Sequence, residues 1–307
     1  MGGVLSGFAA IWVIATVGYL LARGRVLGEA APEVLGRLVF FVATPALLFV
    51  TLSRTSLDRI VTGALLVFVV ATILAALIHT LVARLVWRRG AGRTTIGALG
   101  ASYVNAANLG LPIAAYVLGD VSLVVPVLLF QVLLAAPFAL TVLDLASGRG
   151  RPSPRSVALL PARNPIMIAS AAGIAVAASG WTPPALLLEP FELVGAAAVP
   201  GALLAFGMSV PGARPLHPGP EAPDRYLAVA LKVIVQPALA YLIGRFLFGL
   251  DDAALFAAVV TSALPAAQNV FVFALRYRES ETLARDVVML STLASALTMI
   301  VAAVFLT

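Results

Sequence analysis

The sequence predicts an all-α integral membrane protein with ten membrane-spanning helices, arranged as two inverted repeats of five helices each. Three observations support this fold class. The composition is too apolar for a water-soluble domain, the basic residues concentrate in alternate loops between apolar runs, and one run in each half is interrupted by polar residues.

The amino-acid composition is that of a membrane protein. Hydrophobic residues make up 61% of the chain and charged residues 11%, with a mean hydropathy of +1.05. Water-soluble domains carry about a quarter charged residues, so we expect the lipid bilayer to be the protein's solvent. The formal charge of +6 comes without a basic face or an RNA-binding motif, so nucleic acid is not an expected partner. The chain has no cysteine, which excludes disulfides and thiol chemistry.

Ten apolar runs approach or exceed the length of about 20 residues that a helix needs to cross a bilayer. They lie at residues 4–22, 34–53, 60–87, 95–118, 121–146, 163–179, 190–210, 226–250, 253–275 and 287–306. The first run lacks the basic segment and cleavage site of a signal peptide, so we expect it to remain in the protein as a span.

The basic residues test this count. When the N-terminus is placed outside, all but three of the 20 Lys and Arg residues fall near the cytoplasmic ends of the spans. The three exceptions are Arg54, Arg59 and Arg245. The pattern predicts ten spans with both termini outside the cytoplasm. Because the chain is rich in Ala and Arg and has a single Lys, we expect a bacterial protein of the cell (inner) membrane.

The two halves of the chain are expected to have opposite orientations, because each contains an odd number of spans. We expect a first repeat at residues 1–146, a cytoplasmic linker rich in Pro, Gly and Arg at residues 147–162, and a second repeat at residues 163–307. Pro112 and Pro265 occupy corresponding positions in the two repeats. Inverted repeats of this kind are typical of secondary transporters.

The interrupted runs read N-A-A-N-L-G-L-P, from Asn105 to Pro112, and L-P-A-A-Q-N, from Leu264 to Asn269. In hydrocarbon every backbone polar group needs a partner within the protein, so a broken helix persists only where it lines a cavity or packs against protein. A pair of such interruptions, one in each half, predicts a binding site near the midplane of the bilayer.

The prolines of these runs have a defined effect on the backbone. Each lacks an N–H and frees the carbonyl four residues earlier, which is that of Asn108 for Pro112 and that of Thr261 for Pro265. Because proline suits the first turn of a helix, we expect unpaired N–H groups just after it. These belong to Ile113 and Ala114, and to Ala266 and Ala267. Such helix N-termini bind anions, whereas the freed carbonyls suit a cation or water.

Amide side chains complete the expected site. Asn105 and Asn108 are three residues apart and are predicted to share a helical face. The candidate substrate-binding residues are Asn105, Asn108, Gly110, Pro112, Ile113, Pro265, Gln268 and Asn269. An isolated Asn more often bonds a neighbouring helix, and an isolated Pro is commonly a tolerated kink. The occurrence of both types in both halves favours a binding site.

Four further polar residues lie inside apolar runs and are candidates for ion or proton coupling: His79, Gln131, Lys232 and Gln236. Lys232 lies toward the cytoplasmic end of its run, so its side chain is expected to snorkel toward the surface. For His79, helix packing is the alternative role. No metal or other cofactor is expected. Three modes of transport stay open: transport without a coupling ion, transport coupled to Na⁺, and transport coupled to H⁺.

The chain resembles the auxin efflux carrier family at these residues. The resemblance rests on N-x-x-N-x-G-x-P from Asn105 to Pro112 and P-x-x-x-N-x-F-x-x-A from Pro265 to Ala274, with T-P-A-L-L-F in the second run and V-P-G-A-L-L-A-F-G in the seventh. It covers essentially the whole chain. It implies a ten-span inverted-repeat fold, related to sodium/proton antiporters and bile-acid/sodium symporters, in which the broken spans 4 and 9 cross.

The same resemblance implies a division of labour among the spans. Spans 1, 2, 6 and 7 would form a scaffold, through which members often form homodimers, and spans 3–5 and 8–10 would form the transport core. Asn164 and Pro165, at the opening of the sixth run, also match the family. Family substrates are organic acids such as auxin, malate and malonate.

The leading functional hypothesis is a secondary transporter of small organic anions that works by alternating access, with its site at the crossing of spans 4 and 9. A channel or a membrane receptor for a small organic acid is the first alternative. An intramembrane enzyme is a remote one, because H-E-x-x-H, G-x-S-x-G, a cysteine nucleophile and paired mid-membrane carboxylates are all absent. The remaining candidate catalytic group for such an enzyme is a dyad of Ser102 and His79.

Overall fold

The structure is a computed structural model that describes residues 2–54, 62–147, 165–211 and 219–306. Within these ranges the chain is helical, apart from one isolated antiparallel bridge between Val104 and Ala266. The expected linker lies outside the described residues except for Ser147, and so does Asn164. The chain forms two compact units that interleave along the sequence, and each is described by itself.

The first unit contains Met1–Thr62, Ala107–Leu129 and Ala158–Gly212. Its helices are α1 (Gly2–Arg23), α2 (Ala31–Leu38), η1 (Val39–Ala43), α3 (Thr44–Ser53), α6 (Leu111–Ile113), η5 (Ala114–Leu118), η6 (Val121–Leu123), α10 (Pro165–Ser179), α11 (Ala185–Gly195) and α12 (Ala198–Ser209). Two more helices, η4 (Ala106–Gly110) and α7 (Val125–Phe130), each share one residue with the second unit.

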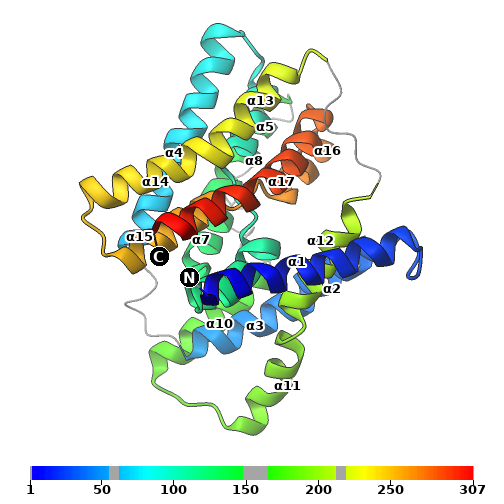
Figure 1. Ribbon diagram of the computed structural model, residues 1–307, viewed down its shortest axis with the longest axis vertical. Helices are drawn as coiled ribbons and strands as arrows, with labels where there is room; N and C mark the ends of the chain where they lie inside the picture. The colour runs from blue at the N-terminus through cyan, green and yellow to red at the C-terminus, as the bar shows by residue number, and fades with distance from the viewer. Residues whose placement is uncertain (1, 55–61, 148–164, 212–218, 307) are drawn as a thin grey trace. The chain divides into compact units, whose positions relative to one another are not determined.

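Helices α1 and α12 of the first unit pack closely because glycine stands at their contact (Figure 1). A Cβ added at Gly207 would overlap the carbonyl oxygen of Ala15, and one added at Gly18 would overlap that of Leu204. Small residues let membrane helices approach at backbone distance, where dispersion contacts hold them together. These two glycines therefore determine how the two helices fit.

The second unit contains Gly63–Ala106, Phe130–Val157 and Ala213–Thr307. Its helices are α4 (Gly63–Leu81), η3 (Val82–Val86), α5 (Ala91–Ser102), η7 (Gln131–Ala135), α8 (Ala136–Ala146), α13 (Ala222–Ala230), η9 (Leu231–Val235), α14 (Gln236–Leu242), η10 (Ile243–Leu247), α15 (Asp252–Ala263), α16 (Gln268–Tyr277) and α17 (Glu281–Leu306). Helix α17 packs along α13, α15 and α16 (Figure 1).

Three long helices among the described residues pass a proline at a π turn without breaking. A π turn precedes Pro45, Pro137 and Pro237, and each proline is the second residue of the α-helix that follows. A π turn is wider than an α turn and leaves room for the ring. Proline also leaves the carbonyl four residues earlier without its usual donor. At Pro237 this is the Val233 carbonyl, which accepts a 2.8 Å hydrogen bond from the Thr298 hydroxyl.

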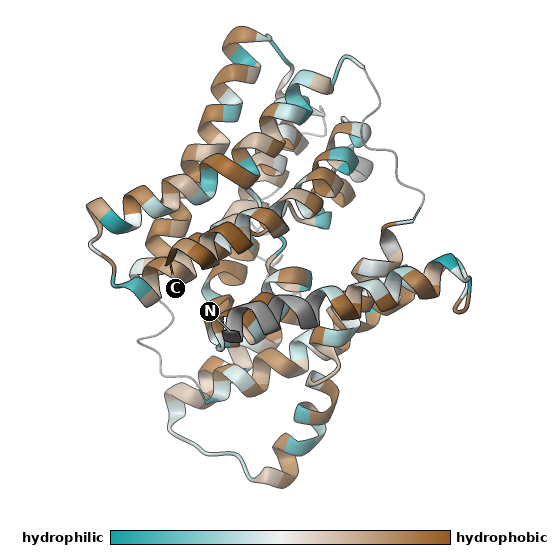
Figure 2. Ribbon diagram, in the orientation of Figure 1, coloured by the Kyte–Doolittle hydropathy of each residue, from teal (hydrophilic) through white to brown (hydrophobic). Residues whose placement is uncertain are grey.

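Six helical stretches among the described residues are long and apolar enough to cross a membrane. They are Ala31–Ser53, Gly63–Val86, Val121–Ala146, Ala185–Met208, Ala222–Leu247 and Glu281–Leu306. Shorter apolar helices are Trp12–Arg23, Ala106–Leu118, Pro165–Ser179 and Asp252–Ala263. Hydrophobic residues run along the helices, and polar residues gather at many of their ends (Figure 2). The chain is thus a multi-pass membrane protein, whereas ten spans and an inverted repeat stay predictions.

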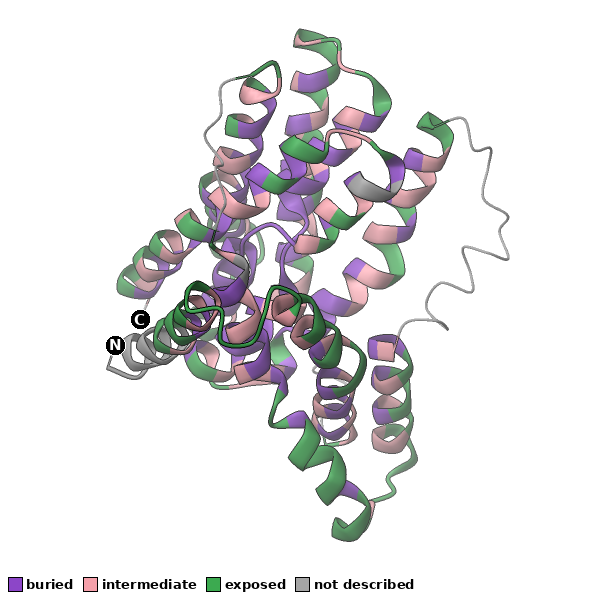
Figure 3. Cartoon of the chain, turned by 90° about the vertical axis from the view of Figure 1, so that its right-hand side faces the viewer, coloured by how far each residue is buried: buried purple, intermediate pink, exposed green. Residues whose placement is uncertain are grey.

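The interior of the second unit consists of apolar clusters that surround its extended segments. Tyr103 and Ala267 belong to a cluster built from α5, α8, α16 and α17, and Ala266 belongs to one built from α5, α13, η9 and α17. Figure 3 shows buried residues on the inward faces of these helices and exposed residues on their outer faces. Close packing therefore holds the non-helical backbone in one position.

Candidate functional site

Two helices of the second unit are interrupted in the regions that the sequence singled out. Helix α5 ends at Ser102 and helical structure resumes at Ala106, while α15 ends at Ala263 and α16 begins at Gln268. The extended segments between them, residues 103–105 and 264–267, are called the crossing below. They lie next to each other, since Val104 and Ala266 form an antiparallel bridge.

The backbone of the crossing is paired across the two segments. The Asn105 N–H donates to the Pro265 carbonyl at 2.8 Å, and the Ala267 N–H donates to the Tyr103 carbonyl at 2.9 Å. Non-helical backbone can exist at membrane depth only when it finds partners within the protein. Each broken helix therefore supplies partners for the other, and neither break would be stable alone.

The position of the first break differs from the prediction. Pro112 lies inside a continuous helical stretch from Ala106 to Leu118, and Asn105 precedes this helix. Asn105 and Asn108 therefore do not share a helical face. The physical reason is again a π turn. The π turn η4 ends directly before α6 and leaves room for Pro112, which is the second residue of α6.

The N–H groups after Pro265, expected to be free, are paired. The Ala266 N–H donates to the Ser291 hydroxyl at 3.0 Å, and the Ala267 N–H donates to the Tyr103 carbonyl. The backbone stays extended for two residues after the proline, so the helix N-terminus begins at Gln268.

Two other backbone expectations are also wrong. Ile113 and Ala114 lie within the helix, and the Ala114 N–H donates to the Leu111 carbonyl. The Thr261 carbonyl accepts a 3.4 Å bond from the Leu264 N–H, which closes the last turn of α15. Local turns thus satisfy groups that the proline rule alone leaves open.

Lys232 and Gln236 belong to one neighbouring helical stretch and bond the ends of α5 and α15 directly beside the crossing. The Lys232 ammonium donates to the Gln236 side-chain oxygen and, at 2.9 Å, to the Ser262 carbonyl. The Gln236 side-chain N–H₂ donates to the Thr72 hydroxyl at 2.9 Å and to the Ser102 carbonyl at 3.3 Å. Both side chains are 0% exposed. The expectation that Lys232 snorkels is wrong, because its ammonium finds acceptors inside the unit.

A third coupling candidate, Gln131, also reaches the crossing, where its side-chain N–H₂ donates to the Val104 carbonyl at 2.9 Å. His79 does not. It is buried against Gly97 and interacts with Asp224, including its backbone, rather than with the crossing. The Ser102 hydroxyl donates to the carbonyl of Ala98 in its own helix. The Ser102–His79 dyad is therefore not formed.

The predicted substrate-binding residues fall into two groups. Asn105, Pro265, Gln268 and Asn269 belong to the second unit at the crossing, where Asn105 is buried and Asn269 is exposed. Asn269 has a side-chain hydrogen bond with Tyr103. Asn108, Gly110, Pro112 and Ile113 belong to the first unit, so their part in a site at the crossing stays a prediction.

A cavity of about 820 Å³ lies within the second unit between α4, α5 and the η7–α8 stretch. Its lining is mostly apolar, but Ser102, Tyr103 and Gln131 bring it to the crossing, and Arg84 also contributes to it. Small-molecule sites have this size and this combination of an apolar wall with a few polar groups.

Sequence reasoning missed several residues of this site, notably Thr72, Tyr103 and Ser291. Each places a hydroxyl-bearing side chain at or beside the crossing. The only available signal was a hydroxyl inside an apolar run. That signal is weak, because most such hydroxyls bond a carbonyl in their own helix, as Thr261 does.

Buried carboxylates of the second unit are paired with arginine and lie apart from this network. Asp224 and Asp286 are both 0% exposed. Asp224 forms ion pairs with Arg89 at 3.0 Å and with Arg93 at 2.7 Å. Asp286 forms ion pairs with Arg225 at 2.9 Å and with Arg285 at 2.7 Å. The described part of the crossing thus carries no carboxylate that would repel an anion.

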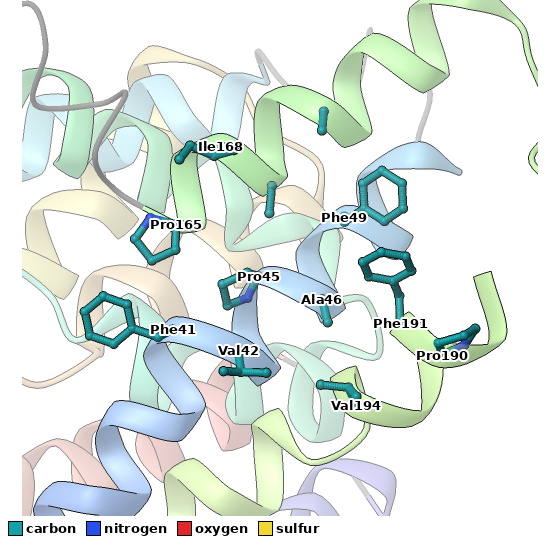
Figure 4. A pocket seen from close by; sticks show the side chains of 12 residues that line it. Phe41, Val42, Pro45, Ala46, Phe49, Pro165, Ile168, Pro190, Phe191 and Val194 are labelled. Carbon is teal, nitrogen blue, oxygen red and sulfur yellow. The ribbon is translucent and has the colours of Figure 1, made fainter. Parts of the chain in front are cut away.

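The first unit has a groove of a different kind. It has a volume of about 580 Å³ and is lined by apolar side chains of η1, α3, α10 and α11, including Phe49 and Phe191, whose ring centroids are 5.0 Å apart (Figure 4). Without a polar side chain in its lining, this groove cannot orient an organic anion, so it is not a candidate substrate site.

Comparison with known proteins decides the family. A family model described as "Membrane transport protein" matches residues 4–153 and 147–303. The chain belongs to this family, which is of the auxin efflux carrier type. The resemblance inferred from the broken spans is thereby confirmed.

Relatives point in the same direction. A "Putative malonate transporter" of Rhizobium meliloti is 30% identical over 307 residues, which cover 97% of this chain and 92% of that relative. An "Uncharacterized transporter" of Methanothermobacter thermautotrophicus is 34% identical over 116 residues, 37% of this chain and 38% of that relative. The protein is therefore a membrane transporter and not an enzyme.

Proposed function

We propose that this protein is a secondary transporter of small organic anions that works by alternating access, with the substrate carboxylate bound at the crossing. The observation that carries the proposal is the pairing of two broken helices inside the second unit of a transporter-family chain. The preferred substrates are dicarboxylates such as malonate or malate, and auxin-like acids are the next candidates. The name of the full-length relative supports malonate.

An anion suits the electrostatics of this place. Helix α16 begins at the crossing, and the N-terminus of a helix carries a partial positive charge of about half an elementary charge. Gln268 and Asn269 stand in its first turn and supply amide donors. Because the buried carboxylates are paired elsewhere, an entering carboxylate meets donors and no like charge.

The apolar cavity beside the crossing supports the auxin-like candidates, which have a hydrophobic body as well as an acid group. Arg84 lines it together with Ser102, Tyr103 and Gln131. A second carboxylate or a polar ring substituent would find donors there. This arrangement suits organic acids.

Alternating access needs one part of the protein to move against another. We propose that spans 1, 2, 6 and 7 are the scaffold and that spans 3–5 and 8–10 are the mobile core, in the bacterial inner membrane with both termini outside the cytoplasm. The division of the chain into two compact units supports this assignment for spans 1, 2, 6 and 7, which fall in the first unit, and for spans 3, 8, 9 and 10, which fall in the second. Residues 107–129, in spans 4 and 5, fall in the first unit and depart from it. The apolar groove on the first unit supports a homodimer formed through the scaffold (Figure 4).

Uptake by proteoliposomes tests the proposal. Radiolabelled malonate should enter saturably, and unlabelled malate should compete. Asn269→Ala should lose most of this uptake, whereas Ser147→Ala, an exposed control at the end of α8 and outside the crossing, should not. Linear flux that no acid competes with would establish a channel instead, and absence of flux for every organic acid would reject the substrate class.

A further inference from the structure

The cavity between α4, α5 and the η7–α8 stretch is much longer than a small organic acid. Its lining reaches from Thr72, beside the crossing, to Arg84, and these two residues lie twelve positions apart on one helical stretch. At a rise of about 1.5 Å per residue, this separation is about 18 Å. An acid held at the crossing fills only one end, so most of the cavity has room for a second occupant.

The part of the cavity away from the crossing has a surface that suits hydrocarbon. Leu77 and Phe138 contribute apolar side chains to its walls. The hydroxyl of Thr95, on the α5 side, donates to the Ala91 carbonyl of its own helix at 2.9 Å, so it does not need water as a partner. Such a surface is stabilised more by an apolar chain than by water.

The open side of this part lies between α4 and α8, where the lining residues are exposed. Leu77 of α4 is 47% exposed and Phe138 of α8 is 73% exposed, so both are placed to contact lipid. Trp87 follows α4 and η3 directly, and tryptophan gathers at the level of the lipid headgroups. The length of about 18 Å therefore corresponds to one leaflet, whose hydrocarbon is about 15 Å thick.

Two arginines at the Trp87 end of the cavity are available to an anion. Arg84 and Arg88 are exposed, and neither forms an ion pair in the described part of the chain. Arg89 and Arg93 differ from them, because both are paired with Asp224. This end of the unit is the one that we propose to be cytoplasmic, where anionic lipids give the leaflet a negative surface potential. The two charges thus complement a lipid phosphate.

We propose that this cavity binds one anionic phospholipid of the cytoplasmic leaflet, with its phosphate on Arg84 and Arg88 and one acyl chain between α4 and α8. The end of the cavity beside Ser102 and Gln131 is left to the substrate. The inference goes beyond the proposed function and uses only the orientation proposed there. The bound acyl chain closes the cavity on the side of the bilayer and so separates the crossing from freely exchanging lipid.

Native mass spectrometry of the detergent-purified full chain measures this binding. The probes are dioleoyl phosphatidylglycerol and dioleoyl phosphatidylcholine, which share their acyl chains and differ in net charge. Wild type should bind one phosphatidylglycerol about thirtyfold more tightly than phosphatidylcholine, at about fivefold per arginine. The double variant Arg84→Gln with Arg88→Gln should bind the two lipids with nearly equal affinity.

Matched variants separate this site from general charge and from general lipid contact. Arg23→Gln with Arg37→Gln removes two exposed arginines from the first unit and should keep the preference for phosphatidylglycerol. Thr95→Phe places a ring inside the cavity and should abolish the tight binding of phosphatidylglycerol. Leu297→Phe places a ring on the exposed surface of α17, outside the cavity lining, and should not.

Any of three results would overturn the proposal: equal affinity of wild type for the two lipids, an unchanged preference in the Arg84 and Arg88 variant, or displacement of phosphatidylglycerol by malonate. Tight binding that persists in a folded Thr95→Phe variant would also contradict it. If Thr95→Phe does not fold, the exposed arginine pair and its control decide on their own. None of these measurements depends on uptake, so failure of organic-anion transport would reject the proposed function and leave this test intact.

Discussion

Gln236→Leu tests whether the polar network at the crossing holds the second unit together. The change keeps the approximate volume of the side chain but removes three hydrogen bonds, to Lys232, Ser102 and Thr72. A hydrogen bond between membrane helices is worth about 0.6 kcal/mol on average and up to about 1.7. A buried group left without its partner costs about 1–3 kcal/mol, and more when it is charged.

These magnitudes can be assigned partner by partner. Thr72 can turn its hydroxyl to a carbonyl of its own helix, so its loss is expected to stay near the average value. The Ser102 carbonyl and the Lys232 ammonium are buried, and among the described residues the ammonium keeps only its bond to the Ser262 carbonyl. We expect Gln236→Leu to lower the free energy of unfolding by about 2–4 kcal/mol in total.

Unfolding of the purified protein in detergent, followed by circular dichroism, measures this loss. A matched control is Gln131→Leu, which removes a single bond from the same type of residue at the same crossing. Its expected cost is about 0.6–1.7 kcal/mol. Equal stability of Gln236→Leu and wild type, or equal losses in the two variants, would refute the idea that Gln236 connects both half-helices.

Three further predictions concern the site and the topology. Asn108→Ala and Asn269→Ala should each abolish or strongly reduce substrate binding in a radioligand assay while expression and monodispersity persist; normal binding would remove that residue from the site. Organic carboxylates should compete for uptake and their methyl esters should not, because the donors of the crossing select a negative charge, and equal competition by the ester would indicate a mainly apolar pocket. A cysteine at Trp181, which avoids the positive φ of Gly180, should react with an impermeant thiol reagent on intact cells, and one at Gly219 only after lysis. Labelling of both from one side would contradict the predicted spans.

Much of the architecture could be predicted from local pattern. Length and hydropathy located the apolar helices, and clusters of Asn, Gln, Gly and Pro located the regions of both breaks. Such patterns are reliable because every residue in a bilayer meets the same demand, an apolar side chain and a satisfied backbone. The family followed from the same residues.

The exact positions of the breaks could not be read from the prolines. A π turn accommodates Pro112 within a helix, whereas residues 103–105 leave the helix without any proline. They do so because their backbone groups pair with residues 264–267, more than 150 residues later in the chain. A pairing at that separation has no local signature.

Lys232 shows most clearly which features follow from the sequence and which depend on the tertiary structure. Its apolar neighbours, the alternation of basic loops and the two amide-rich interruptions all follow from residue order, and they specify a membrane transporter with a polar centre. Whether the ammonium turns to the surface or inward depends on acceptors that the local segment does not contain. Only the packed fold brings the carbonyl ends of α5 and α15 beside one helix, and their combined negative potential is what keeps the lysine inside.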